Sequence, residues 1–275
     1  MPADLDVMRE LWRACVPVEF VLSPDEVVSV ERPSAVYLLV PRIAYFPFVY
    51  KQLRRYFGTF IESSASSSNV DTTWLEYDTT PLKWHHPVGV LYDTLVQSES
   101  LPWQLTVHYK GFPSGELLDY ESLDSLRSLF VQTIKEADQL KHKAEVINEM
   151  QQREHRLLWN GLQTCTQADS FERFWSVNRN LMVNSENMPI RHMPIRIYQA
   201  GRPCVQRLVP PHTERGDRTT LRDVCRLLAP HLLDSSHLVL RTHAVDIPLE
   251  TPAVWLCENM AYPDNFVHLV LSIQP

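Results

Sequence analysis

The sequence predicts an α+β protein of three consecutive parts, in which two β-rich parts of similar element order flank a helix-rich middle. The chain has 275 residues, more than one ordinary domain needs, and 44% of them are hydrophobic, which is enough to build cores. β-Branched and aromatic runs dominate both ends, whereas helix formers at helical spacing dominate the centre. We place the three parts at residues 1–112, 113–190 and 191–275.

The first part is expected to open with a short helix and to continue with strands and helices. Apolar residues recur at three- and four-residue spacing from Phe46 to Phe60, which predicts an amphipathic helix with Pro47 in its first turn. The other expected elements are a helix at 6–13, a strand hairpin at 18–22 and 36–40, a serine-rich loop at 63–69, a strand at 73–77, a helix at 88–95 and a strand at 105–109.

The middle part is expected to be helical, and the last part is expected to repeat the element order of the first. Apolar residues repeat at helical spacing through residues 126–150, which predicts one continuous helix, and Asp169 or Ser170 could cap a further one. The last part should contain a hairpin of strands at 195–198 and 205–209, a helix capped by Thr219 or Thr220, a strand at 238–240, a short helix after 252 and a closing strand at 266–273. This element order is that of the ubiquitin-like β-grasp fold. We therefore expect two ubiquitin-like β-grasp domains flanking a helix-rich domain.

The distribution of lysine is uneven. Half of the six lysines, Lys135, Lys141 and Lys143, lie within nine residues of the middle part. With about 100° per residue along a helix, Lys135 lies roughly 180° from the centre of the apolar stripe, and the other two lie nearer to it. Lys135 should therefore face solvent. It is either an ordinary solvated charge or an acylation target whose neutral amine attacks a thioester.

Composition argues against several function classes. The net charge is −7 with basic and acidic residues interleaved, so we expect no nucleic-acid binding. Only 7 glycines occur, without a phosphate-binding motif, and we expect no cofactor. No apolar run is long enough for a membrane span, and residues 1–10 do not read as a secretory signal. The seven tryptophans mostly fall in apolar stripes, which predicts that they are core residues.

The sequence also gives little support for a cysteine nucleophile or a histidine metal site. The five cysteines contain no CxxC pair, which favours reduced thiols. Cys165 is expected in a loop and is the best candidate for an exposed nucleophile, with His142 or His155 as its base. The six-residue spacing of His231, His237 and His243 fits no ligand face, so we expect no metal. We therefore do not expect an enzyme.

Several segments resemble one known family along nearly the whole chain. They are residues 80–89 (TPLKWHHPVG), 101–103 (LPW), 134–138 (IKEAD), 140–143 (LKHK), 146–150 (VINEM), 194–198 (PIRIY) and 262–266 (YPDNF). In these segments the chain closely resembles the autophagy-related protein five family. The chain departs from that pattern in its serine-rich loop at 63–69, in the pair His85–His86, and at Arg127, where an acidic residue is expected. Docking of a conjugating enzyme near Arg127 could therefore differ.

The resemblance implies a specific function. The lysine of the family's "KEAD" segment corresponds to Lys135, and it receives the C-terminal glycine of the ubiquitin-like autophagy protein twelve. Autophagy protein seven is the activating enzyme, and autophagy proteins ten and three are conjugating enzymes. The conjugate binds a coiled-coil helix of autophagy protein sixteen and promotes lipidation of autophagy protein eight on the phagophore membrane.

Further expectations follow from this resemblance. The chain should be a cytoplasmic scaffold that partners recruit to the phagophore membrane surface. Because the sequence ends Ser272-Ile273-Gln274-Pro275 without Gly-Gly, we expect an acceptor rather than a modifier. The alternative is a non-covalent adaptor that binds the coiled-coil helix and targets the complex to membranes, with Lys135 incidental.

Overall fold

The structure, a computed structural model, describes residues 4–62, 73–96, 101–233 and 237–273. The N-terminal elements are α1 (Leu5–Arg13), β1 (Cys15–Leu22), the 3₁₀ helix η1 (Pro24–Glu26), β2 (Val36–Pro41), α2 (Pro47–Phe57), β3 (Trp74–Tyr77), β4 (Thr80–Pro81), α4 (Val88–Leu95) and β5 (Trp103–His108). The helical elements are α5 (Leu123–His142), α6 (Glu145–Glu149), α7 (Gln152–Gln163) and α8 (Ser170–Leu181). The C-terminal elements are β6 (Ile195–Tyr198), β7 (Val205–Gln206), α9 (Leu221–Leu228), the 3₁₀ helix η2 (Pro230–Leu232), β8 (Leu238–Thr242), β9 (Val245–Asp246), α10 (Ala253–Asn259) and β10 (Val267–Ile273).

The two sheets have the same topology. Their strand orders are β2-β1-β5-β3-β4 and β7-β6-β10-β8-β9. In each sheet the first strand pairs antiparallel with the second and parallel with the last long strand. A helix follows each hairpin, α2 in the first sheet and α9 in the second. This repeated arrangement confirms the prediction of two ubiquitin-like β-grasp domains around a helix-rich domain.

The hydrophobic residues form two cores. One core runs from the first sheet and its helices into the helical part, and the other fills the second β-grasp domain. Most tryptophans are buried, as predicted: Trp12, Trp74, Trp84, Trp103 and Trp159. The first β-grasp domain and the helices therefore share their apolar packing, whereas the second β-grasp domain has a core of its own.

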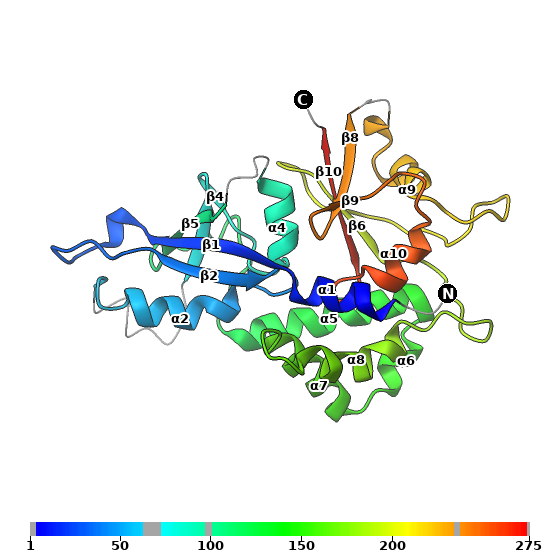
Figure 1. Cartoon of the computed structure of the whole chain (residues 1–275), viewed down its shortest axis with the longest axis horizontal. Coiled ribbons are helices and arrows are strands. Elements are labelled where there is room, and N and C mark those ends of the chain that lie inside the picture. The colour runs from blue at the N-terminus through cyan, green and yellow to red at the C-terminus, as the bar shows by residue number, and fades with distance from the viewer. Residues whose placement is uncertain (1–3, 63–72, 97–100, 234–236, 274–275) are drawn as a thin grey trace.

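Helix α1 connects the three parts. Figure 1 shows it at the centre of the molecule, close to α10 and above the helical part. The Trp12 indole packs on Phe174 with ring centroids 4.9 Å apart and donates a 3.0 Å hydrogen bond from Nε1 to Ser170 Oγ. At the other end, the backbone N–H of Asp4 donates to Asn259 Oδ1 at 2.7 Å. These contacts tie the N-terminus to both the helices and the second β-grasp domain.

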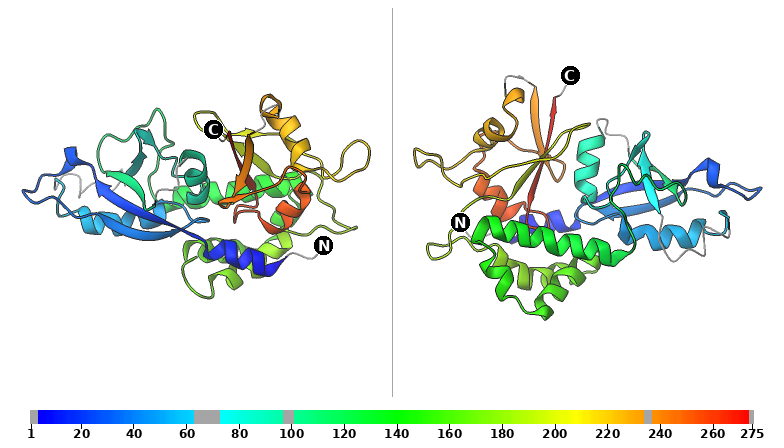
Figure 2. Two further views of the ribbon diagram at one scale, coloured as in Figure 1. Left: turned by 45° about the horizontal axis from the view of Figure 1, so that its top comes forward. Right: turned by 180° about the vertical axis from the view of Figure 1, so that it is seen from behind.

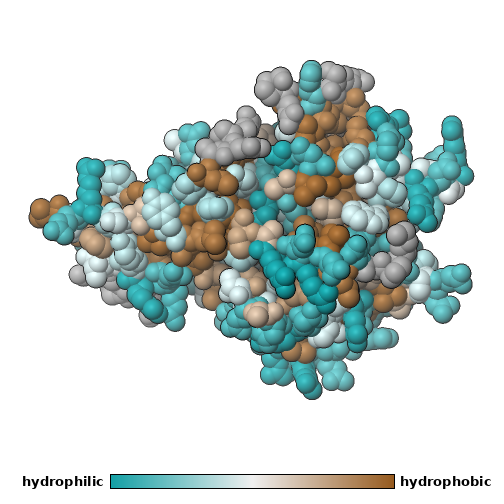
Figure 3. Space-filling model, in the orientation of Figure 1, coloured by the Kyte–Doolittle hydropathy of each residue, from teal (hydrophilic) through white to brown (hydrophobic). Residues whose placement is uncertain are grey.

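Helix α5 runs along the back of the molecule beneath both sheets (Figure 2, right). Hydrophilic residues dominate the part of the helical region that faces the viewer in Figure 3. The predicted continuous helix through Met150 is wrong. Lys143 and Ala144 adopt left-handed backbone conformations with φ of 57° and 63°, which ends α5 at His142 and starts α6 in a new direction.

Smaller sequence predictions also need correction. Phe60 lies beyond α2, which ends at Phe57. The predicted strand at 205–209 is shorter, since β7 covers Val205–Gln206 and Val209 forms only an isolated bridge with Met193. Helix α7 was not predicted. The serine-rich loop at 63–69 lies outside the described residues.

Candidate functional site

Lys135 lies near the middle of the solvent-facing side of α5. The helix begins after Ser122, whose hydroxyl accepts a 3.2 Å hydrogen bond from the backbone N–H of Asp124. Its apolar side chains Leu126, Phe130 and Ile134 are buried. The opposite side is exposed and consists of Asp124, Ser128, Gln132, Lys135 and Gln139. The exposure predicted for Lys135 from helical spacing is therefore confirmed.

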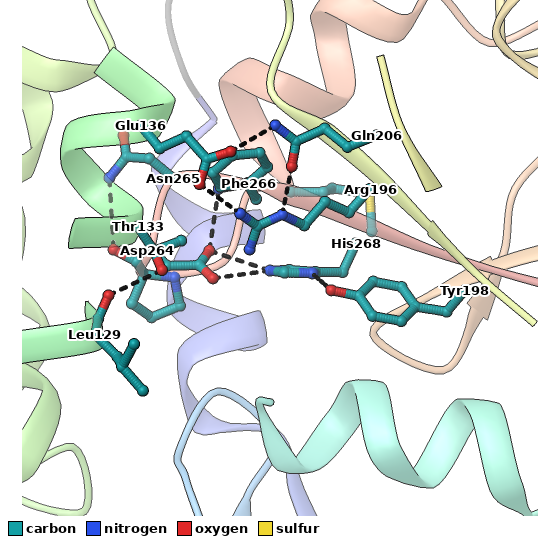
Figure 4. A network of polar contacts seen from close by, with 12 residues as sticks. Leu129, Thr133, Glu136, Arg196, Tyr198, Gln206, Asp264, Asn265, Phe266 and His268 are labelled. Carbon is teal, nitrogen blue, oxygen red and sulfur yellow. Dashed lines mark hydrogen bonds and ion pairs between the residues drawn. The ribbon is translucent and has the colours of Figure 1, made fainter. Parts of the chain in front are cut away.

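The residue after Lys135 fixes the helix to the second β-grasp domain. Glu136 accepts hydrogen bonds from Arg196 Nη2 at 2.8 Å and from Gln206 Nε2 at 2.7 Å, one on each carboxylate oxygen. Arg196 Nε also donates to Gln206 Oε1 at 2.8 Å, so the three side chains form a closed set (Figure 4). Because Glu136 lies next to Lys135, this clamp orients the turn of α5 that carries the lysine.

A buried network lies beside the clamp. His268 lies between the Asp264 carboxylate, 2.9 Å from its Nε2, and the Tyr198 hydroxyl, 2.8 Å from its Nδ1 (Figure 4). Burial raises the pKa of the Asp264 carboxyl, but the charge and hydrogen bond of His268 and the charge of Arg196 outweigh burial and hold that pKa below its usual value. The Arg196 guanidinium also lies over the Phe266 ring, 3.8 Å from its centroid. Arg196, which holds Glu136, therefore also lies against this buried network.

The two neighbouring lysines occupy different environments. Lys141 is buried, with 2% of its surface exposed, and its Nζ donates to the Leu181 carbonyl and to Asn265 Oδ1 at 2.8 Å. Burial lowers the pKa of Lys141 to about 8. Lys143 is exposed at the left-handed end of the helix. Of the three clustered lysines, Lys141 is therefore inaccessible to another protein.

The end of α5 is held by a buried contact between Asp138 and His142. Asp138 is fully buried. Its Oδ1 lies 2.8 Å from His142 Nδ1, and its Oδ2 accepts a 2.9 Å hydrogen bond from the backbone N–H of Ile147. His142 Nε2 lies 2.9 Å from the Val183 carbonyl oxygen. This arrangement joins α5, α6 and the end of α8, and it fixes the helix three residues after Lys135.

Cys165 does not have the environment of a nucleophile. The expected exposure is wrong, because only 8% of its surface is accessible in the turn between α7 and α8. Burial raises the pKa of its thiol to about 12, which leaves almost no thiolate at neutral pH. One of the histidines suggested as its base, His142, contacts Asp138 instead.

Two further observations concern ligands and membranes. Among the described residues, no group of three or more His, Cys, Asp and Glu is placed to hold a metal ion. None of the helices in the described ranges combines the length and apolar character that a membrane crossing requires.

The geometry defines a class of protein: two β-grasp domains around a helical bundle, with one exposed lysine on the long helix α5. Sequence models of one family match all three parts, as "Autophagy protein ATG5, UblA domain" at residues 11–109, "alpha-helical bundle region" at 123–184 and "UblB domain" at 192–271. The chain belongs to the autophagy protein 5 family. This membership gives it a role in autophagy. The predicted boundaries at 112/113 and 190/191 remain a prediction.

Individual relatives agree with this assignment. "Autophagy protein 5" of Drosophila melanogaster is 35% identical over 272 residues, covering 98% of this chain and 97% of the fly protein. "Autophagy-related protein 5" of Caenorhabditis elegans is 31% identical over 282 residues, covering 98% of both chains. The crystal structure of Kluyveromyces marxianus Atg5 superposes with a TM-score of 0.83 at 20% identity, over 98% of this chain and all of that one, which establishes the shared fold. The relatives are named as autophagy proteins and not for a catalytic activity.

Proposed function

We propose that Lys135 is the acceptor of an isopeptide bond to the ubiquitin-like autophagy protein twelve. The observation that carries the proposal is an exposed amine on a helix that is fixed directly after it, by the Glu136 clamp and by the Asp138–His142 pair. Lys135 also lies in the Ile134–Asp138 segment that resembles the acceptor segment of the family. An acceptor held in one orientation lowers the entropic cost of meeting a thioester carried by another protein.

The chemistry at Lys135 is aminolysis. The ammonium group first loses one proton, and the neutral amine attacks the carbonyl carbon of the glycine thioester on the conjugating enzyme. The C–N bond forms, the C–S bond breaks, and the enzyme's cysteine leaves as a thiolate while the amine nitrogen loses its second proton to solvent. The chain contributes the nucleophile and its position, and the activation of the glycine is done by other proteins.

The same proposal extends to the partners of the chain and to the membrane at which they act. Autophagy protein seven would activate autophagy protein twelve, and autophagy protein ten would transfer it to Lys135. The conjugate would bind the coiled-coil helix of autophagy protein sixteen and act with autophagy protein three as a ligase-like factor for lipidation of autophagy protein eight. The complex would work at the phagophore membrane, to which partners recruit it from the cytoplasm.

The proposal is tested by reconstituted conjugation. The reaction contains the activating and conjugating enzymes, autophagy protein twelve and ATP, and wild type is compared with Lys135→Arg on a reducing gel. Lys143→Arg is the matched control, since Lys143 is also exposed and lies on the same segment. We expect a shifted band with wild type and with Lys143→Arg but not with Lys135→Arg. A band that persists in Lys135→Arg would refute the acceptor assignment, and the absence of any band would favour the non-covalent adaptor.

A further inference from the structure

The two β-grasp sheets differ in what covers the face opposite their own core. In the second sheet, Tyr198 and Val270 of that face are buried in the first core, and α4 of the first β-grasp domain packs against β10. In the first sheet, the corresponding side of β2 is accessible, with 64% of Tyr37 and 70% of Leu39 exposed. Figure 3 shows hydrophobic residues gathered over β1 and β2. The first sheet therefore keeps open the face that its counterpart buries.

β2 is also the long edge strand of the molecule. It has six residues, whereas the other edge strands in the described ranges, β4, β7 and β9, have two each. Edge strands are usually protected from pairing by short length, by charged residues or by bulges. β2 has the sequence VYLLVP, without a charge, and it pairs with β1 at six consecutive positions without a bulge. Such an edge is suited to accept a further strand.

The register shows which backbone groups of β2 face outward. The backbone N–H of Arg42 donates to the Ala14 carbonyl at 2.8 Å, which makes these two residues a hydrogen-bonded pair at the end of the β1–β2 ladder. Pair types alternate along an antiparallel ladder, so Leu39, opposite Pro17, and Tyr37 lie at non-hydrogen-bonded positions. Pro17 agrees with this pattern, because it has no N–H to donate. The N–H and C=O groups of Tyr37 and Leu39 therefore point away from β1, toward the open edge.

Glu19 gives the open face a negative charge. Its two carboxylate oxygens accept hydrogen bonds from neutral donors, the Tyr37 hydroxyl at 2.7 Å and Gln104 Nε2 at 3.1 Å. No ion pair among the described residues involves Glu19. The other charged side chains on this face of the strands are Glu76 and His108, which lie 3.4 Å from each other. The charge of Glu19 therefore favours a partner with a basic side chain.

We propose that β2 is a docking site for an extended peptide of a partner protein, which adds to the first sheet as a further strand. Backbone hydrogen bonds to Tyr37 and Leu39 would give affinity, and alternate side chains would give specificity. The peptide should carry apolar residues at alternate positions, beside Tyr37 and Leu39, and a lysine or arginine on the same face to reach Glu19. A second copy of this chain is a poorer occupant, because its own β2 would bring another Glu19 and no cation. The inference does not depend on the acceptor role of Lys135.

The binding test uses a phage-displayed library of random nine-residue linear peptides, selected on the full chain. Selected peptides are synthesised with a fluorescein label and titrated by fluorescence anisotropy. Leu39→Pro removes the outward N–H without breaking a bond to β1, and it should weaken binding by roughly tenfold or more. Leu39→Val keeps this N–H and is the matched control, with binding within about twofold of wild type. Glu19→Gln keeps an acceptor for the Tyr37 hydroxyl and should weaken binding by about fivefold at low salt and less at high salt.

Amide hydrogen exchange measured by NMR identifies the binding mode on the wild-type chain. In the free chain, the N–H groups of Tyr37 and Leu39 should exchange faster than those of Leu38 and Val40, which are bonded to β1. A bound peptide should slow the exchange of the Tyr37 and Leu39 amides by roughly tenfold or more. Because this readout needs no variant, it decides the question even if circular dichroism shows that Leu39→Pro does not fold.

Several results would overturn the inference. One is a selection that yields no binding peptide, and another is a peptide that binds without slowing exchange at Tyr37 and Leu39. Equal affinity for wild type and a folded Leu39→Pro would also overturn it. Selected peptides without basic residues, unaffected by Glu19→Gln, would contradict the partner chemistry assigned here. A dimer of the free chain in sedimentation equilibrium that dissociates in Leu39→Pro would show that a second copy occupies the edge instead.

Discussion

His243 occupies the tight turn between β8 and β9, where the second β-grasp domain meets the first. Its ring is buried, stacks on Tyr262 at 3.9 Å between centroids, and places Nε2 3.1 Å from the Met260 carbonyl oxygen. Its Nδ1 has no hydrogen-bond partner among the described residues. The next residue, Ala244, donates its backbone N–H to Asp93 of α4 at 3.1 Å. A positive charge on His243 would therefore arise inside the contact between the two β-grasp domains.

The energetic consequence follows from linkage. Burial, and then the charge of Arg42, lower the pKa of His243 to about 3, whereas an unfolded histidine has a value of about 6.5. Between these values the unfolded chain binds a proton that the folded chain excludes, so stability is lost as pH falls below 6.5. From pH 6.5 to pH 5 the loss is 1.5 pH units at about 1.36 kcal/mol per unit, or about 2 kcal/mol.

The assay is urea unfolding at pH 7 and pH 5, followed by circular dichroism. The variant is His243→Asn, since asparagine tolerates the φ of 51° found at this position and does not titrate in this range. His237→Asn, at an exposed histidine, is the control. We expect wild type and the control to lose about 2 kcal/mol more between the two pH values than His243→Asn does. Equal losses in all three proteins would refute the argument.

Three other substitutions test the packing that positions Lys135 and the second core. Asp138→Ala should lower the free energy of unfolding, measured in urea, by about 3–5 kcal/mol, because it leaves His142 without its buried partner. A loss under about 1 kcal/mol would contradict this expectation. Gly161→Ala should lower the free energy of unfolding by about 1–3 kcal/mol in the same assay, since the added Cβ would lie 2.9 Å from Phe174 Cβ between α7 and α8. An unchanged free energy of unfolding would show that the two helices can move apart to accommodate the methyl group. Thr220→Ala removes the capping box of α9 and should lower the stability measured by thermal unfolding by about 1 kcal/mol. An unchanged midpoint of thermal unfolding would contradict a stabilising role for the cap.

The helices were largely predictable because their apolar spacing and caps are local features. α9 is an example, since Thr220 and Asp223 form a capping box directly before its apolar positions. The short strands β4 and β9 were missed for a local reason too. Their turns have two consecutive residues with positive φ, at Asp78–Thr79 and His243–Ala244, and neither pair contains the glycine that usually marks such a turn.

The break between α5 and α6 was hidden by composition. Lys143 and Ala144 are ordinary helix formers, and Ala144 continues the apolar spacing, so the sequence favours a continuous helix. The left-handed turn is stabilised by tertiary contacts instead, since Asp138 accepts the backbone N–H of Ile147 across it. Propensity was overridden by a buried hydrogen bond that only the folded chain can form.

Of the candidate site, the sequence predicted the exposure of Lys135 but not the packing of α7 against its helix. The exposure of Lys135 follows from the periodicity of its own helix. The packing of α7 against α5 through Trp159 and Phe130 was not predicted, because polar and charged residues dominate the start of α7. The burial of Cys165 likewise depends on the folded chain, in which residues distant in sequence, among them Trp12 of α1, line the same pocket as Cys165.

The central claim is that one amine, on Lys135, forms the bond to autophagy protein twelve. The most direct measurement is peptide mapping of the purified conjugate by mass spectrometry after proteolysis. We predict a single branched peptide whose branch point is Lys135, with Lys83 and Lys143, both exposed, recovered unmodified. A branch point at any other lysine, or no branched peptide from a conjugate that survives reduction, would contradict the claim.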